Sequence, residues 1–245
     1  MSKRLNNNAK LLFGVLYKMN LNIKTALRPL TLSLLPALLS SNAMAFEAGD
    51  IIIRAGVANV SPSVSSSNIS VDDVEQAGTG VDVNDNTQLG ILGTYMLTNQ
   101  WGVSVLASSP FKHDISGENI GIDDIGSTKQ LPPTVTLDYF PLKHTNPWQP
   151  HIGLGLNYTI FYSEDSSSEL DSGLGGGTRL DLTNSLGLAV KAGLDYKKND
   201  RFGLNATVFW IDIDTEATIT SNAGRVTVDV DVDPYVYMLT ASYRF

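Results

Sequence analysis

A strict alternation of apolar and polar side chains constrains this fold more than any other feature of the sequence. Between Tyr235 and Phe245 every odd-numbered residue is apolar or aromatic, whereas the even-numbered residues include Thr240, Ser242 and Arg244. Successive side chains of a β-strand point to opposite faces, so this stretch has one apolar face and one mixed face. Such a strand suits a wall between lipid and a lumen.

The same alternation recurs in eight segments that we predict to be strands. They are Asp50–Val60, Thr87–Leu97, Trp101–Phe111, Leu131–Phe140, Trp148–Tyr162, Thr183–Lys197, Arg201–Asp214 and Val232–Phe245. The short connections are Thr98–Gln100, Pro141–Pro147 and Lys198–Asp200, and the long ones are Ser61–Asn86, Lys112–Gln130, Ser163–Leu182 and Thr215–Asp231. An even strand count with alternating short and long connections is typical of bacterial outer-membrane barrels. We therefore predict an all-β fold, an eight-stranded antiparallel transmembrane β-barrel with short periplasmic turns and long extracellular loops.

Residues 1–45 have the pattern of a cleaved secretory signal. Basic residues precede an apolar run, Leu30–Leu39, and the small-x-small pattern of a signal peptidase site follows at Ala43-Met44-Ala45. The run contains Pro36 and is shorter than the roughly 20 residues that cross a bilayer as a helix. We expect cleavage before Phe46, with residues 46–245 as the barrel domain. A start at Met19 gives a signal of ordinary length.

Composition narrows the classes of function. Residues 46–245 carry 11 Lys and Arg against 25 Asp and Glu, a formal net charge of −14, so the basic footprint of a nucleic-acid-binding protein is absent. The sequence has no cysteine and therefore no disulfide framework or thiol chemistry. Its histidines, His113, His144 and His151, suggest no Ser/His/acid arrangement by their spacing. We expect no enzymatic activity, no cofactor and no nucleic-acid partner.

Alternation alone leaves open which face of the barrel is outside, because a soluble lipocalin-type barrel turns its apolar face inward. Two observations favour the membrane orientation. Apolar rows such as Ile152, Leu154 and Leu156 lie on one face of a predicted strand, and the opposite face of the same strand carries small residues such as Gly153 and Gly155. Aromatic residues also gather at the predicted strand ends, where interface girdles belong. These are Tyr95, Trp101, Tyr139, Trp148, Tyr158, Tyr196, Trp210 and Tyr235.

Charged side chains fall on the inward rows toward the end that carries both termini. They are Arg54, Asp138, His151, Lys191, Asp195 and Arg244. Buried charges persist when they are paired and hydrogen-bonded, so we expect a charged plug that closes the periplasmic end of the lumen. A proton or ion relay is the alternative. We favour the plug because side chains largely fill the interior of an eight-stranded barrel.

Apolar side chains fall on the inward rows nearer mid-strand and toward the long loops. They are Leu92, Met96, Leu106, Phe161, Phe209 and Met238. An apolar upper lumen excludes ions through their desolvation cost and favours hydrocarbon groups. From residue chemistry alone, a path for hydrophobic solutes and an ordinary packed interior remain equally good interpretations.

Acidic residues cluster around the last long connection. Asp212, Asp214 and Glu216 are expected to face Asp229, Asp231 and Asp233 across a turn at Asn222-Ala223-Gly224. Calcium prefers oxygen ligands of this kind, but the sequence contains no EF-hand loop. We favour a solvated acidic rim, assign no metal site, and interpret Ser61–Ser70 and Gly173–Gly177 as loops.

Several segments in a characteristic order resemble the outer membrane protein W (OmpW) family. They are Gln88–Gly90, Thr94–Met96, Pro110–Ile115, Leu131–Thr134, Gly153–Thr159, Asp212–Thr215 and Asp233–Phe245. The resemblance implies an eight-stranded barrel whose hydrophobic channel passes small hydrophobic molecules toward the membrane through a lateral opening. Leu106 and Phe209 match positions that narrow this channel, although a Trp is familiar at the second position. The carboxyl-terminal residues Tyr237, Tyr243 and Phe245 resemble the signal read by the barrel assembly machinery.

Together these features predict a protein of the outer membrane of a Gram-negative bacterium. The expected function is a narrow hydrophobic channel for passive passage of small hydrophobic or weakly polar solutes, with lateral exit into the membrane. The alternative is a structural or receptor barrel whose long loops bind a phage, bacteriocin or host surface. The expected partners are outer-membrane lipid and lipopolysaccharide, small hydrophobic solutes and the barrel assembly machinery.

Overall fold

The computed structural model describes residues 46–143 and 146–245. The predicted signal segment, residues 1–45, lies outside the described residues. Among the residues described, the helices are too short or too polar to cross a membrane.

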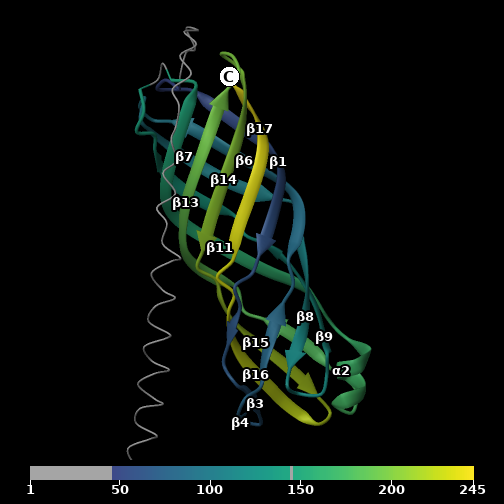
Figure 1. The fold of residues 1–245 in the computed structure, drawn as a ribbon. Coiled ribbons are helices and arrows are strands. Elements are labelled where there is room, and N and C mark those ends of the chain that lie inside the picture. Colours follow the sequence, from purple (N-terminus) through teal and green to yellow (C-terminus); the bar gives the residue numbers. More distant parts are fainter. Residues whose placement is uncertain (1–45, 144–145) are drawn as a thin grey trace, which may run out of the picture. The chain divides into compact units, whose positions relative to one another are not determined.

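Eight strands of the described chain close into an antiparallel barrel, which confirms the predicted fold class (Figure 1). The barrel strands are β1 (Ile51–Ser61), β6 (Asn86–Met96), β7 (Trp101–Ser108), β10 (Thr134–Tyr139), β11 (Trp148–Ser166), β13 (Ser185–Lys197), β14 (Phe202–Ile211) and β17 (Tyr235–Arg244). Their order around the wall is β10-β7-β6-β1-β17-β14-β13-β11, and pairing of β10 with β11 closes the ring. Closure satisfies the backbone hydrogen bonds that a sheet edge would leave open in lipid.

Exposed fractions confirm the predicted orientation of the two faces. Ile152, Leu154 and Leu156 on the outward row are 58–62% exposed. Asn157 and Thr159, on the inward row of the same strand, are fully buried. The apolar face of the barrel therefore points outward, as a lipid-facing wall requires.

Aromatic rings form the expected girdle at the end of the barrel that carries the short turns. The rings of Trp101 and Tyr139 are 4.9 Å apart, and those of Trp148 and Tyr196 are 4.6 Å apart. Each pair joins neighbouring strands at one level, where an amphipathic ring bridges the apolar and polar layers of a membrane.

Two predicted strands are shorter than expected, because prolines interrupt them. The prediction Trp101–Phe111 divides into β7 and β8 (Phe111–Glu118) around Pro110, and Leu131–Phe140 becomes the end of β9 (Asp124–Leu131) and β10 around Pro132-Pro133. Pairing of β7 with β10 ends at Leu106↔Thr134, and pairing of β8 with β9 begins at Phe111↔Gln130. Proline has no backbone N–H to donate, which accounts for the interruption of the ladder between these pairs.

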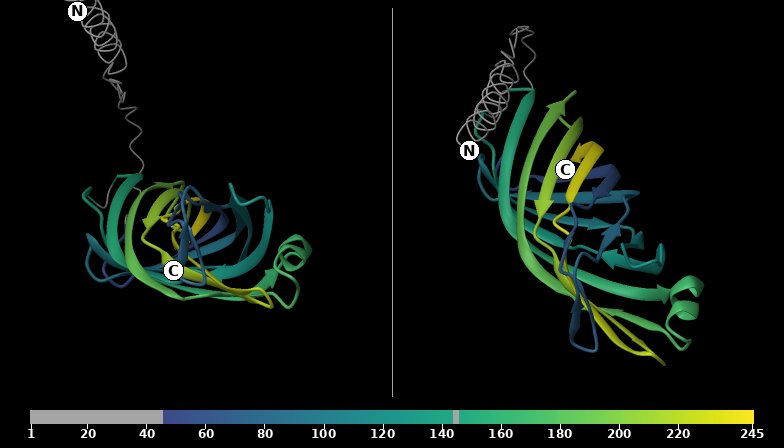
Figure 2. Two further views of the ribbon diagram at one scale, coloured as in Figure 1. Left: turned by 90° about the horizontal axis from the view of Figure 1, so that it is seen from below. Right: turned by 60° about the horizontal axis from the view of Figure 1, so that its bottom comes forward.

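Regular elements occupy all four long connections. This corrects the prediction of loops for the first three, whereas the last was expected to extend a hairpin and does so. The four connections form β2 (Ser65–Ser66), β3 (Ile69–Val71), β4 (Val74–Gln76), β5 (Gly80–Val83), β8, β9, α2 (Ser168–Gly173), β12 (Arg179–Leu182), β15 (Asp214–Ser221) and β16 (Gly224–Asp231). We call these elements, with the end of β11 beyond Thr159, the extension. Strands β5, β8 and β9 continue the barrel sheet beside β11, whereas β12, β15, β16, β3 and β4 form a separate sheet. Figure 2 shows both sheets leaving the barrel at one end, with β11 running from the barrel to α2.

The predicted loops inside these connections also contain ordered elements. Ser61–Ser70 includes β2 and the start of β3. The Gly173–Gly177 stretch begins with the last residue of α2, whose first turn is capped by the side chain of Ser167, 3.0 Å from the backbone nitrogen of Leu170. Gly175, Gly176 and Gly177 have φ angles of 75°, 90° and 71°, which favour glycine and end the helix.

Candidate functional site

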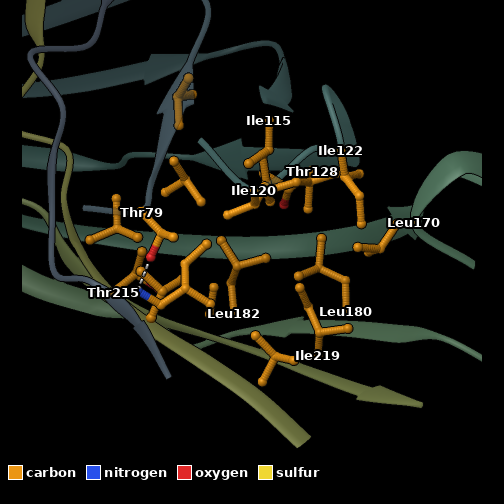
Figure 3. Close-up of a pocket in the computed structure, with 18 of the residues that line it drawn as sticks. Thr79, Ile115, Ile120, Ile122, Thr128, Leu170, Leu180, Leu182, Thr215 and Ile219 are labelled. Carbon is orange, nitrogen blue, oxygen red and sulfur yellow. Dashed lines mark hydrogen bonds between the residues drawn. The ribbon is translucent and has the colours of Figure 1, made fainter. Parts of the chain in front are cut away.

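A cavity of about 500 Å³ lies within the extension, between its two sheets. Aliphatic side chains from successive strands line it, as Figure 3 shows for Ile115, Leu180 and Ile219. The aliphatic lining includes Ile69 of β3, Val81 of β5, Ile115 of β8, Ile125 of β9, Leu180 of β12 and Ile219 of β15. A cavity of this size and character suits a small apolar molecule.

The apolar wall follows from alternation in the extension strands. In β16 the residues Val226, Val228 and Val230 are buried, whereas Arg225 and Asp229 are exposed. This period of two was visible in the sequence, where Thr215–Asp231 was a long connection expected to extend the last hairpin through a turn at Asn222-Ala223-Gly224, and the pairing of β15 with β16 agrees with that expectation. What the sequence did not show is the second sheet that these valines face.

Three polar side chains, His113, Thr128 and Gln130, interrupt the aliphatic lining near the barrel, and each is at most 3% exposed. His113 Nδ1 lies 2.6 Å from the backbone oxygen of Asn84, and its Nε2 lies 3.0 Å from Gln130 Nε2. Burial lowers the pKa of His113, opposed by its hydrogen bond to Asn84 and by the nearby carboxylate of Asp114.

Four of the predicted channel residues form a buried apolar layer in the barrel lumen. They are Leu92 of β6, Leu106 of β7, Phe209 of β14 and Met238 of β17, all at most 4% exposed. They belong to the same apolar cluster as the cavity wall, and the predicted Phe161 lines the cavity itself. Since β7 and β14 lie on opposite sides of the ring, Leu106 and Phe209 approach the axis from opposite walls.

Met96 lies elsewhere, which corrects its predicted place near the long loops. It packs in a separate cluster with Phe46, Ile52 and Phe140. Met96 is the last residue of β6, directly before a short turn, so its side chain lies at the opposite end of the barrel from the extension. Alternation indicated its inward direction correctly but not its height along the axis.

Five of the six predicted luminal charges meet in one network. Arg54 Nε and Nη2 lie 2.7 and 2.9 Å from the two carboxylate oxygens of Asp195, and His151 Nδ1 lies 3.3 Å from Asp195 Oδ2. Lys191 Nζ lies 2.5 Å from Asp138 Oδ2. All five side chains are at most 2% exposed. Opposite charges compensate one another here, as burial of charge requires.

Two hydroxyl groups connect the ion pairs. Thr94 Oγ1 accepts a hydrogen bond of 2.6 Å from Arg54 Nη1 and lies 2.6 Å from Ser104 Oγ. Ser104 in turn donates to Asp138. The network therefore runs continuously from Asp195 to Asp138, and the sequence did not single out its hydroxyl links.

Glycines on the inward rows make room for the charged side chains. A Cβ atom at Gly153 would overlap the Asp138 carboxylate, and one at Gly193 would overlap the imidazole of His151. The glycine-bearing rows noticed in the sequence thus have a packing reason. They let large polar side chains fill a narrow lumen.

Arg244 lies apart from the network described above. Its Nε is 2.8 Å from Asp50 Oδ2, and both side chains are partly exposed at the end that carries the short turns. Lys197 and Phe46, which the sequence did not indicate as luminal, lie nearby, with Lys197 Nζ 3.8 Å from the centre of the Phe46 ring. An aromatic and charged layer therefore closes this mouth below the five-residue network.

The apolar layer and the charged network meet directly. Lys191 Nζ lies 5.7 Å from the centre of the Phe209 ring, within the range of a cation–π contact. Phe209 is also the cross-strand partner of Lys191, and Leu92 is that of Arg54, so the apolar layer adjoins the charged network on the same rungs of the wall, and the aromatic mouth lies at the end with the short turns. A route straight along the axis would have to displace every one of these layers.

The acidic residues face one another as predicted, with Asp214 opposite Asp231 and Glu216 opposite Asp229. The carboxylates of Asp212, Asp214 and Asp233 offer oxygens that lie within 4.8 Å of one another. Partial burial and the neighbouring carboxylates raise the pKa of Asp214. Exposed carboxylates gather in this way on an acidic rim, and we assign no ion to them.

The carboxyl-terminal aromatic residues lie on the outer face. The rings of Tyr243 and Phe245 are 4.7 Å apart, and Tyr237 and Phe245 are more than half exposed. This placement fits the membrane girdle. A role of Tyr237, Tyr243 and Phe245 as an assembly signal stays a prediction.

Comparison with known proteins agrees with this architecture. Residues 47–245 match the OmpW family. Outer membrane protein W of Vibrio cholerae is 40% identical over 218 residues, which cover 87% of this chain and 97% of that protein. Outer membrane protein W of Escherichia coli is 36% identical over 209 residues, which cover 85% of this chain and 94% of that protein. The crystal structure of the outer membrane protein OprG from Pseudomonas aeruginosa is similar with a TM-score of 0.79 at 42% identity, covering 82% of this chain and 98% of that one. The chain therefore belongs to the OmpW family and is an eight-stranded barrel of the Gram-negative outer membrane.

Proposed function

We propose that this barrel is a narrow passive path for small hydrophobic or weakly polar solutes, which enter the cavity of the extension and leave sideways into the membrane. The observation that carries the proposal is the aliphatic cavity of about 500 Å³ above a closed lower lumen. Moving apolar surface from water into such a cavity is favourable by about 25 cal/mol per Å². Ions gain nothing comparable there and lose their hydration.

The closed lower lumen supports a lateral rather than an axial exit. Below the cavity, Leu106 and Phe209 belong to the buried apolar layer, and the paired charges of Arg54 and Asp195 follow. A hydrophobic solute that continued along the axis would break compensated buried charges, which is costly. The barrel wall beside the cavity is therefore the better route.

The wall has an interruption at the right height for such an exit. Residues Ala107–Pro110 and 131–133 lie between the β7–β10 and β8–β9 ladders. Gln130, which lines the cavity, forms a pair with Phe111 at the first rung beyond this gap. Fewer ladder hydrogen bonds hold the strands together here, so separating them costs less than elsewhere in the wall. We call residues 107–110 and 131–133 the seam.

Flux measurements test the proposal. Purified protein is reconstituted in vesicles that carry lipopolysaccharide in the outer leaflet, and entry of a small fluorescent hydrophobic solute is followed. We expect faster entry than into protein-free vesicles, and slower entry with Leu106→Asp or Phe209→Asp, because a carboxylate in the buried apolar layer adds a desolvation cost. Leu188→Asn on the lipid face is the control. Equal entry with and without the protein would refute the channel and leave the receptor alternative.

A further inference from the structure

The hydrogen bonds around Gln130 determine which polar group it offers to the cavity. His113 Nδ1 lies 2.6 Å from the backbone oxygen of Asn84, and a carbonyl oxygen is an acceptor, so Nδ1 carries the proton and donates. In the neutral ring the other nitrogen, Nε2, is then a bare acceptor. The amide nitrogen of Gln130, 3.0 Å away, donates to it.

This arrangement settles the orientation of the Gln130 amide. The two ends of a glutamine amide are distinguished by their hydrogen-bond partners. Because the nitrogen is committed to His113, the oxygen Oε1 is directed away from that ring. Within the described part of the chain, the amide nitrogen of Gln130 is hydrogen-bonded to His113. The side chain of Gln130 also lines the cavity. The cavity floor therefore presents an acceptor oxygen.

Two hydroxyl groups of the cavity lining donate their hydrogens to backbone oxygens of the cavity wall. Thr79 Oγ1 donates to the backbone oxygen of Gln76 at 2.6 Å, and Thr215 Oγ1 donates to that of Thr183 at 2.7 Å. Figure 3 shows Thr79 and Thr215 among the aliphatic side chains. Thr79 Oγ1 also accepts a hydrogen bond of 2.9 Å from the backbone N–H of Ile69, and Thr215 Oγ1 lies 3.4 Å from Thr183 Oγ1. These two hydroxyl groups are thus bonded within the wall and offer no hydrogen to a molecule in the cavity.

We propose that the cavity selects apolar molecules that carry one hydrogen-bond donor, a hydroxyl or an N–H group, and that Gln130 Oε1 accepts this bond. The inference rests on the proposed function, because it assumes that the cavity holds hydrophobic solutes. A donor group that enters an aliphatic cavity loses its bonds to water unless an acceptor replaces them. A pure hydrocarbon, in contrast, leaves the buried oxygen of Gln130 without a partner.

Gln130 also lies where selection can affect passage. Its partner Phe111 follows the seam directly, and Gln130 pairs on its other side with Phe161 of β11. A molecule bound through its donor group would therefore have that group beside the seam and its apolar body among the aliphatic strands. This places the selective contact next to the lateral exit.

A matched pair of ligands tests the inference. The probes are 2-naphthol and 2-methylnaphthalene, which share one ring system and differ in a hydroxyl against a methyl group. Their dissociation constants are measured for the folded protein in lipid nanodiscs, with protein-free nanodiscs subtracted. The variant is Gln130→Met, which keeps the length of the side chain and removes the amide.

The control is Gln149→Met, the same change at another glutamine that is 2% exposed. Gln149 donates to the backbone oxygen of Asn146 at 2.8 Å, near a short turn and away from the cavity. The preference for naphthol over methylnaphthalene is expected to fall by about 3- to 10-fold in Gln130→Met, the range of one hydrogen bond. Gln149→Met is expected to keep the native preference.

The outcomes separate this inference from the proposed function. The same preference in the native protein and in Gln130→Met would overturn the inference and leave the cavity as a binding site. Failure of both probes to bind saturably would overturn the proposed function as well. If Gln130→Met does not fold, the side-chain amide signal of Gln130 is followed by NMR in the native protein. Naphthol is expected to shift it more than methylnaphthalene does, and equal shifts would contradict the inference.

Discussion

Arg54 of β1 and Asp195 of β13 meet across the lumen through two hydrogen bonds of 2.7 and 2.9 Å. Strands β17 and β14 separate these two strands in the ring, so the pair ties distant parts of the wall together. Both side chains are at most 1% exposed. This bidentate pair is the central contact of the closed lower lumen, and its removal should show what the closure contributes.

Removing one partner of this pair should destabilise the barrel strongly. Asp195→Ala leaves Arg54 as an uncompensated buried charge, which is expected to lower the free energy of unfolding by about 3–5 kcal/mol. The double variant Arg54→Met/Asp195→Leu should lose less, since no charge remains unpaired. Urea unfolding in lipid vesicles, followed by tryptophan fluorescence, measures both. The exposed pair Arg179–Asp181 is the control, with an expected effect of about 0–1 kcal/mol. Similar losses at the two sites would contradict the role of burial.

A methyl group at Gly193 should disturb the packing of the lumen. Its Cβ would overlap the imidazole of His151 and the hydroxyl of Thr207. Gly193→Ala is therefore expected to lower the free energy of unfolding by about 1–3 kcal/mol, as overpacking does. At Gly93 the nearest atom to an added Cβ is the flexible end of Ile53, 3.5 Å away, so Gly93→Ala is the matched control. Loss of stability in the control alone would show that space at Gly193 is not limiting.

Locking the seam should slow the flux of a hydrophobic solute. The chain has no cysteine, so an introduced pair forms a single defined disulfide. Ala107→Cys and Pro133→Cys lie one residue beyond the pair Leu106↔Thr134, and adjacent strands are close enough to be bridged. We expect slower solute entry in the oxidised protein and recovery after reduction.

The control for the seam uses the same two strands. Val103→Cys and Leu137→Cys replace directly paired residues inside the intact ladder of β7 and β10. Oxidation of this pair is expected to leave solute entry unchanged. If both disulfides slow entry equally, or neither does, the seam is not the exit.

His113 should stay neutral at a pH where an ordinary histidine is half protonated. Burial lowers its pKa below the usual value of 6.5. As the pH falls through 6.5, this histidine is protonated in the unfolded chain before it is protonated in the folded barrel. Its titration therefore leaves the free energy of unfolding unchanged well above pH 6.5 and lowers it below that pH. Imidazole ¹⁵N shifts, assigned by comparison with His113→Gln, should show the neutral Nδ1–H form at pH 6.5. A half-protonated ring at that pH would contradict the buried, carbonyl-bound geometry.

The inward direction of most luminal residues could be predicted from the sequence, because side-chain direction in a strand repeats every two residues. Arg54, Asp138, Lys191 and Asp195 are buried in the lumen as their parity predicted, and so are Leu106 and Phe209. Strand number and the outward apolar face follow from the same local rule. The ends of β7 and β10 were missed because we extended the alternation through Pro110 and Pro132.

The cavity depended on tertiary structure. Its wall requires β16 to pair with β3, where Val226 lies opposite Val71, and it requires that sheet to face β8 and β9. Alternation within Val226–Val230 shows that one face is apolar but does not identify the distant segment that covers it. The same limit explains Met96, whose direction was predictable and whose neighbours were not. Side-chain direction is a property of the local backbone, whereas strand pairing in the extension and the contacts of each luminal side chain depend on how segments far apart in the chain pack together.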